Sequence, residues 1–189
     1  MGRYITNSID EENYKLLIQT IRNGYTDKDG HKHRPNNQIA NILVLEANLG
    51  CRIGDIIKLR TDSFILDGNI WKLNIVEEKT KKKRTFIVPK QTKRFIDNIT
   101  DGKDGYIFTV KEPAVWKCLR QVTDYLGIEN CSSHSFRKYC ANSLYESTGH
   151  DIEAVCTFLQ HSSVTTTRRY IRRSDAKLEK AINEIVSIV

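Results

Sequence analysis

The stretch NIWKLNIVEEKTKKKRTFIVP, residues 69–89, differs in composition from the rest of the chain. Residues 69–77 and 84–89 are rich in β-branched and aromatic side chains, which favour strands. The charged run EKTKKK (78–83) lies between them. This order predicts a β-hairpin with a basic tip, and SFILDG (63–68) predicts a third strand before it.

Helical patterns flank the hairpin on both sides. Before it, Ser8 and Glu11 match an S-x-x-E capping box that starts a first helix. After a polar loop over residues 24–37, a second helix is expected to end at Gly50, and a short third one to run from Gly54 to about Leu59. The helices expected after the hairpin are KQTKRFIDNI (90–99), AVWKCLRQVTDYLG (114–127), HSFRKYCANSLYES (134–147), DIEAVCTFLQ (151–160) and SDAKLEKAINEIVSIV (174–189). The sequence therefore predicts an α+β fold, mainly α-helical with a small antiparallel β-sheet, in a single domain over residues 1–189.

Charge and composition narrow the class of protein. The 189-residue chain carries 30 Lys and Arg against 23 Asp and Glu, a formal net charge of +7. A basic excess favours a polyanionic partner, of which nucleic acid is the commonest. The sequence has neither the apolar core of a signal peptide nor the roughly 20 consecutive apolar residues of a membrane span. We therefore expect a cytoplasmic protein without a membrane partner.

The cysteines and one histidine pair do not indicate a metal site. None of the five cysteines forms a CxxC pair, which argues against a disulfide framework and a Cys-based zinc site. The stretch HKH at 31–33 could bind a metal, but a solvated loop is the simpler interpretation. No cofactor is expected.

Polar residues with phosphate chemistry recur along the chain in a fixed order. Each has a structural interpretation when taken singly: an arginine next to a carboxylate forms a salt bridge, and a lysine run is usually a solvated turn. An H-x-x-R pair places both side chains on one helix face, where they can address one phosphate. The candidates are Arg52 with Asp55, then Lys79, Lys81, Lys82, Lys83 and Arg84 in the hairpin, then His134 and Arg137, and finally His161 and Tyr170.

Together these segments resemble the tyrosine recombinase, or phage integrase, family, and the resemblance covers nearly the whole chain. NLGCRIGDIIKLR is similar to the first-arginine box of the family, and EKTKKKRTFIVP is similar to its lysine hairpin. HSFRKYCAN resembles the H-x-x-R helix, and VCTFLQHSSVTTTRRYI resembles the box that ends in the nucleophile. The departures are Gln160 where a glycine commonly precedes the second histidine, and Lys138 where a histidine is common.

The two arginines suit the chemistry of a phosphodiester. Substitution at phosphorus gathers negative charge on the non-bridging oxygens, which Arg52 and Arg137 can bind without losing their own charge. Such donors are typically worth about 3 kcal/mol each in a dry site. We expect His161 to bond the same phosphate, Asp55 to orient an arginine, and Lys81, Lys82, Lys83 and Arg84 to contact DNA. No metal is implied, because the arginines supply the electrostatic stabilisation.

The resemblance implies that Tyr170 is the nucleophile. A free phenol has a pKa of about 10, so only about one in a thousand is ionised at neutral pH. Nearby cations favour the phenolate, and His134 could accept or relay its proton. The expected product is a 3′-phosphotyrosine with a free 5′-hydroxyl, which stores the phosphodiester energy and needs no ATP. The resemblance assigns the general acid to a hairpin lysine; Lys79 is the best match, and Lys81 to Lys83 are rivals.

The expected function is that of a site-specific DNA recombinase, acting on double-stranded DNA and of prokaryotic, phage or mobile-element origin, associated with the nucleoid. The resemblance also implies a tetramer on DNA. Most relatives carry an N-terminal core-binding domain that we expect to be absent from this sequence, so that the chain is either an excised fragment or one of the short forms without that domain. The apolar face of 174–189 predicts either packing within the chain or docking on a neighbouring protomer. The alternatives are a type IB topoisomerase, which relaxes supercoils by similar chemistry, and a non-catalytic DNA-binding regulator.

Overall fold

The computed structural model describes residues 6–79 and 81–171, and its centre is the helix α2, Asn37–Leu49. Asn36 caps this helix by accepting a hydrogen bond from the backbone N–H of Ile39. Most of the apolar residues of α2 are buried, because the helix packs against α1 (Glu11–Asn23), α3 (Ile53–Ile56) and α6 (Ser133–Ser147). It ends at Gly50, as predicted. Gly50 has a left-handed φ of 57°, and a Cβ added there would lie 2.9 Å from Phe158 and 3.0 Å from Leu159.

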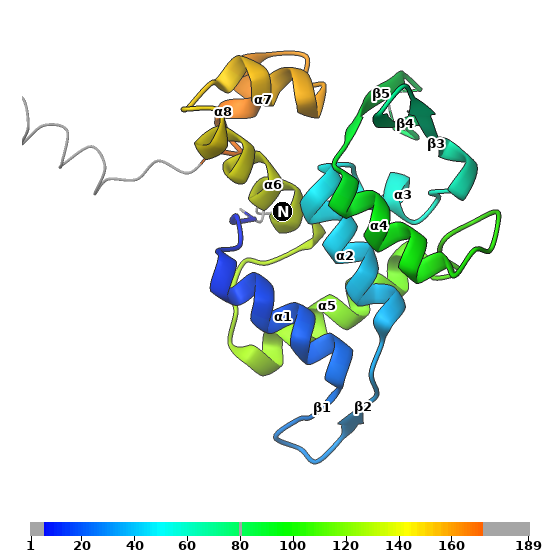
Figure 1. Ribbon diagram of the computed structural model, residues 1–189. Helices are drawn as coiled ribbons and strands as arrows, with labels where there is room; N and C mark the ends of the chain where they lie inside the picture. The colour runs from blue at the N-terminus through cyan, green and yellow to red at the C-terminus, as the bar shows by residue number, and fades with distance from the viewer. Residues whose placement is uncertain (1–5, 80, 172–189) are drawn as a thin grey trace, which may run out of the picture.

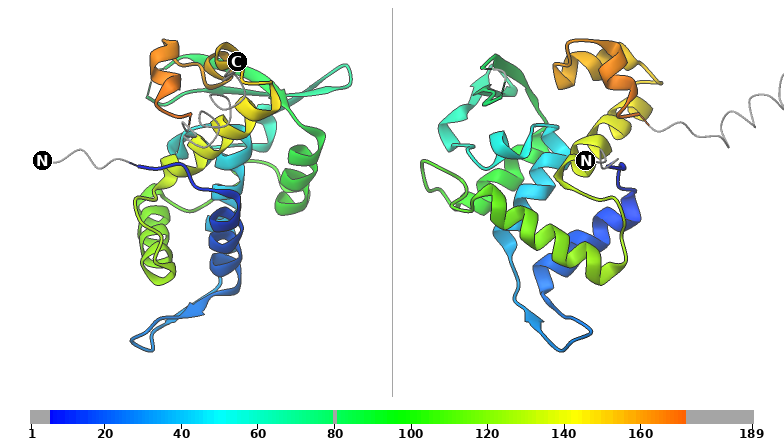
Figure 2. Two further views of the ribbon diagram at one scale, coloured as in Figure 1. Left: turned by 90° about the vertical axis from the view of Figure 1, so that its left-hand side faces the viewer. Right: turned by 180° about the vertical axis from the view of Figure 1, so that it is seen from behind.

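The remaining helices surround this core (Figure 1). They are α4 (Lys90–Thr100), α5 (Glu112–Leu126), α7 (Ile152–Leu159) and α8 (Val164–Arg168), with a 3-10 turn η1 at Thr61–Ser63. The three-stranded sheet and the pair α7–α8 lie at one end of the helical body, and a small hairpin of β1 (Tyr25–Thr26) and β2 (Lys32–His33) lies at the other (Figures 1 and 2). This separation places the predicted site residues at the end that carries the sheet.

The predicted hairpin and the third strand are confirmed. The sheet has the antiparallel order β3 (Phe64–Asp67), β4 (Ile70–Val76), β5 (Lys83–Val88). The loop between β4 and β5 is closed by two backbone bonds, from the N–H of Glu77 to Lys82 at 3.0 Å and from the N–H of Lys81 to Glu77 at 2.8 Å. Side chains alternate across the sheet, so that Leu73 and Val88 are buried while Ile87 is 60% exposed.

The local start and end signals were predicted less well than the elements. The capping box at Ser8 and Glu11 was wrong, because Asp10 caps α1 and accepts from the N–H of Asn13 at 2.8 Å. Asp10 lies directly before the helix and its carboxylate is a strong N-cap acceptor. The short helix expected from Gly54 is α3, Ile53–Ile56, and the predicted loop 24–37 contains β1 and β2. The helix expected at 174–189 lies outside the described residues.

Two further features of the described residues concern helix length and the state of the cysteines. None of their helices has the length and apolar character needed to cross a bilayer. All five cysteines are free, and three of them are only partly buried. Neither feature conflicts with the α+β architecture that the sequence predicts.

Candidate active site

Arg137 lies at the centre of the candidate site and is fully buried. It belongs to the second turn of α6, which begins with reciprocal bonds between Ser132 and Ser135. Its Nη1 donates to the carbonyl of Gly50, and its Nη2 donates to the carbonyl of Leu159 at 2.9 Å. The guanidinium therefore joins the end of α2 to the end of α7. Burial lowers the pKa of Arg137, although a guanidinium still remains charged at neutral pH.

His161 lies between Arg137 and Tyr170. Its Nε2 is 3.4 Å from Nη2 of Arg137, and its Nδ1 is 3.0 Å from Oγ1 of Thr167. The ring centroids of His161 and Tyr170 are 4.7 Å apart. Burial, followed by the charges of Arg137, Arg52 and Arg84, lowers the pKa of His161 to about 4. The imidazole is thus neutral at pH 7; since a guanidinium only donates, Nε2 accepts from Arg137 and Nδ1 carries the proton.

Arg52 is held by a carboxylate that the sequence interpretation missed. Arg52 stands at the N-cap of α3, and its Nη1 lies 2.6 Å from Oε2 of Glu77. Glu77 is almost fully buried, and its other oxygen lies 3.7 Å from Nη1 of Arg84. One signal could have found it: Trp71, Leu73 and Ile75 face the core from β4, and the same period of two points Glu77 inward.

The two-residue period of a strand also explains why the prediction for Arg84 on β5 was wrong. We expected Arg84 to contact DNA, but its side chain is fully buried, since it shares the inner face of β5 with Phe86 and Val88. Its Nη2 donates to the carbonyl of Phe158 at 2.5 Å, and its guanidinium lies 4.3 Å from the ring centroid of Phe86. Arg84 is therefore part of the support beneath the site.

Asp55 lies between the site arginines and the hairpin loop. It is buried, and its Oδ1 accepts a hydrogen bond from the backbone N–H of Glu78 at 2.8 Å. Burial raises the pKa of Asp55. Glu77 is the carboxylate that forms an ion pair with Arg52, whereas Asp55 bonds the start of the hairpin loop. The charges of Arg52 and Arg137 act on Asp55 as well and oppose the rise of its pKa.

The remaining predicted residues lie on the solvent side of this cluster. His134 is exposed one turn before Arg137 on α6. Although the residue is exposed, neighbouring groups shield part of it from water, and this desolvation lowers its pKa; the charges of Arg137, Arg52, Lys138 and Lys79 lower it further. Lys79 and the run Lys81 to Lys83 are all exposed on the hairpin loop and at the start of β5.

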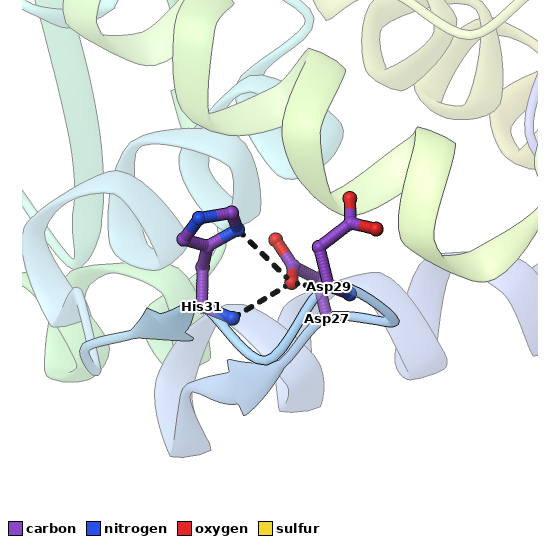
Figure 3. A group of neighbouring side chains, drawn as sticks. All are labelled: Asp27, Asp29 and His31. Atoms are coloured by element: carbon purple, nitrogen blue, oxygen red, sulfur yellow. Dashed lines mark hydrogen bonds and ion pairs between the residues drawn. The ribbon is translucent and has the colours of Figure 1, made fainter.

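A second cluster of polar side chains lies far from this site, in the β1–β2 hairpin (Figure 3). Asp27, Asp29 and His31 bring potential metal ligands within 4.8 Å of one another. One oxygen of Asp27, however, accepts the N–H groups of Asp29 at 3.0 Å and His31 at 2.9 Å, and the other lies 3.0 Å from Nε2 of His33. The bond with His33 and those from the backbone lower the pKa of Asp27 to about 2. The carboxylate thus stabilises the turn, in agreement with a loop.

Comparisons with known proteins give the same architecture. The structure is similar to the XerH site-specific recombinase bound to palindromic difH substrate (TM-score 0.68, 17% identity, 96% of this chain and 53% of that one). It is also similar to the XerA recombinase (TM-score 0.69, 19% identity, 100% of this chain and 67% of that one). The catalytic domain of bacteriophage HP1 integrase matches with a TM-score of 0.62 at 18% identity, over 94% of both chains.

The chain thus spans about half the length of the XerH recombinase and two thirds of that of XerA. A comparison with curated proteins gives no significant match. The family model described as "Phage integrase family" matches residues 7–177, which include both arginines, both histidines and Tyr170. On this match, and with a fold shared by three recombinases or integrases, the chain belongs to the phage integrase family.

Proposed function

We propose that the chain is a site-specific recombinase that cleaves and rejoins double-stranded DNA through a covalent 3′-phosphotyrosine at Tyr170. The observation that carries this proposal is the contact series Tyr170, His161, Arg137. The ring centroids of the first two are 4.7 Å apart, and His161 lies 3.4 Å from Arg137. A nucleophile, a neutral hydrogen-bonding ring and a permanent cation thus converge from three segments of one chain.

Charge stabilisation is assigned to Arg52 and Arg137. Charge that develops on the non-bridging oxygens is best stabilised by donors already held in place. Arg52 is held by Glu77 at 2.6 Å and is partly exposed, so it can receive a phosphate directly. Arg137 has no exposed surface. A phosphate can reach it only after a local opening, and His161, which contacts Arg137, is only partly buried.

Proton transfers are assigned to the exposed residues. The Tyr170 oxygen attacks phosphorus and gives up its proton, for which the exposed and largely neutral His134 is a suitable acceptor. The bond between phosphorus and the 5′-oxygen breaks as the new bond to tyrosine forms. Lys79 gives a proton to the leaving 5′-oxygen. The reverse reaction restores the DNA without an external energy source.

The partners follow from charge and from the relatives. The net charge of +7 and the exposed lysines of the hairpin suit a DNA backbone. Among the similar structures are a lambda integrase dimer bound to a core site and a lambda integrase tetramer bound to a Holliday junction. We propose an equivalent assembly on DNA, with the described residues as its catalytic unit and the nucleoid as its location. Recombinase neighbours favour this function over supercoil relaxation.

A suicide substrate tests the assignment. DNA nicked near the cleavage point loses a short 5′-hydroxyl fragment after attack, so the covalent adduct accumulates and is seen on a denaturing gel. Tyr170→Phe is expected to keep DNA affinity and to form no adduct. Tyr139→Phe and Tyr145→Phe are the controls, because both tyrosines lie on the neighbouring α6. An adduct that persists in Tyr170→Phe would move the nucleophile to another residue.

A further inference from the structure

The backbone and ring of Tyr170 are both contacted by one face of α6. Nδ2 of Asn142 donates to the carbonyl of Tyr170 at 2.9 Å. The ammonium of Lys138 lies 5.8 Å from the centroid of the Tyr170 ring, within the range of a cation–π contact. Lys138 and Asn142 are four positions apart, so they lie one turn apart on the same helix face.

The same two side chains hold the segment that precedes α1. Nζ of Lys138 donates to the carbonyl of Thr6, and Nδ2 of Asn142 lies 3.3 Å from Oγ of Ser8. Asn142 also donates to the carbonyl of Lys138 at 2.7 Å. Thr6 and Ser8, which lie in the N-terminal part of the chain, thus fix the positions of the Lys138 and Asn142 side chains.

Tyr170 depends on such contacts because its local support is small. It follows α8, which has only five residues, and its backbone N–H donates to Thr167 at 2.8 Å within the same turn. Its ring packs against a small apolar cluster whose buried members are Ala141, Val155 and Leu159. In the described part of the chain, Asn142 provides the hydrogen bond that ties the backbone of Tyr170 to a distant element.

We propose that Lys138 and Asn142 are positioning residues for the nucleophile, with Asn142 holding the backbone of Tyr170, Lys138 holding its ring, and Thr6 and Ser8 bracing both. This inference rests on the assignment of Tyr170 as the nucleophile. Since a displacement of about 1 Å can cost a hundredfold in rate, loss of either contact is expected to slow the attack without weakening DNA binding.

Asn142→Asp tests the backbone contact, since it keeps the shape and removes the donor; Asn142→Leu does so without adding a charge. Both are expected to slow adduct formation by tenfold or more, with DNA affinity within twofold of the wild type. Asn48→Asp is the matched control: Nδ2 of Asn48 donates to the carbonyl of Val44 at 2.8 Å, a bond of the same type within α2. It is expected to retain the wild-type rate.

Lys138→Met and Lys138→Arg test the ring contact. Removal of the charge is expected to slow adduct formation by tenfold or more, and arginine is expected to restore most of the rate. Lys93→Met is the control, because Lys93 lies 4.2 Å from the ring centroid of Trp71, which is a cation–π contact away from the site.

A second readout separates positioning from a general defect. In the Tyr170→Phe background, hydrogen peroxide can attack the same phosphate, forming a bond to phosphorus as the bond to the 5′-oxygen breaks and that oxygen is protonated. This reaction does not use the tyrosine, so Asn142→Asp and Lys138→Met are expected to leave its rate unchanged. A parallel loss of the peroxide reaction, or an unchanged adduct rate, would overturn the inference. An adduct in Tyr170→Phe itself would instead refute the proposed function.

Discussion

Arg84 and Arg137 donate to consecutive carbonyls at the end of α7, Arg84 to Phe158 at 2.5 Å and Arg137 to Leu159 at 2.9 Å. The last carbonyls of a helix have no partner within it and carry the negative end of its dipole. Two buried cations from β5 and α6 therefore fix this helix end. Because His161 follows two residues later, the same contacts fix where the second histidine stands relative to Arg137.

Arg84→Met is expected to change the stability of the protein, whereas Lys83→Met is expected to change the salt dependence of DNA binding. Arg84→Met leaves the buried Glu77 without one of its cations, and we expect it to lower the free energy of unfolding by about 3 to 5 kcal/mol. Lys83 is exposed, so Lys83→Met is expected to change stability by less than about 0.5 kcal/mol. It should reduce the slope of log affinity against log salt by about one. Urea unfolding and DNA titrations at several salt concentrations measure both. If the Arg84→Met protein is stable and has a reduced salt slope, Arg84 contacts DNA as the sequence predicted.

Glu77→Gln is expected to slow cleavage by tenfold or more, since Arg52 loses the carboxylate that fixes it 2.6 Å away. The matched control is Glu78→Gln, because Glu78 pairs at 2.5 Å with Lys58 in an exposed salt bridge, a type worth at most about 1 kcal/mol. Single-turnover cleavage compares the two variants. Equal rates for Glu77→Gln and the wild type would show that Arg52 is positioned without Glu77.

Lys79→Ala is expected to slow cleavage of ordinary DNA by about a hundredfold, in the usual range for loss of a general acid. A substrate with sulfur in place of the bridging 5′-oxygen has a leaving group that needs little protonation. It should restore most of the rate to Lys79→Ala and leave Arg52→Ala impaired, which separates proton donation from charge stabilisation. Rescue of Lys81→Ala or Lys82→Ala in place of Lys79→Ala would reassign the general acid within the hairpin.

Glu46 is expected to make stability depend on pH. Its carboxyl is fully buried on α2, and neither oxygen has a hydrogen-bond partner within the described residues. Burial raises the pKa of Glu46 well above its usual value of 4.5, against the opposing charge of Arg137 and with a smaller contribution from Glu112. The folded state therefore keeps a proton that the unfolded state has lost. As pH rises above about 4.5, the free energy of unfolding should fall by up to about 1.4 kcal/mol per pH unit.

The variant Glu46→Gln removes this dependence and serves as the reference. His161 acts in the opposite direction, since its lowered pKa makes the folded state less stable as pH falls from 6.5 towards 4. The difference between wild type and Glu46→Gln therefore isolates Glu46, and urea unfolding between pH 5 and pH 8 measures it. A difference that does not change with pH would mean that Glu46 is ionised in the folded protein.

Sequence patterns predicted the elements well where a pattern is local and long. The hairpin, the third strand and the helices α1, α2 and α4 to α7 all follow from period and composition. The period of two along β4 and β5 also indicates that the side chains of Glu77 and Arg84 point inward, although their charge alone suggested that they face solvent or DNA. Start signals were ambiguous, because Ser8 and Asp10 are both good N-cap residues and only the backbone path selects one of them.

By itself, the sequence determined the mainly helical α+β class, the order of arginine, lysine, H-x-x-R, histidine and tyrosine, and through that order the family. Only the tertiary structure decided which partner each buried charge has. Arg52 pairs with a carboxylate 25 positions away, and Arg84 donates to a carbonyl 74 positions away. The physical reason is that a local pattern depends on the spacing of a few neighbours, whereas a buried cation must find acceptors, and those are fixed by how separate helices and strands pack.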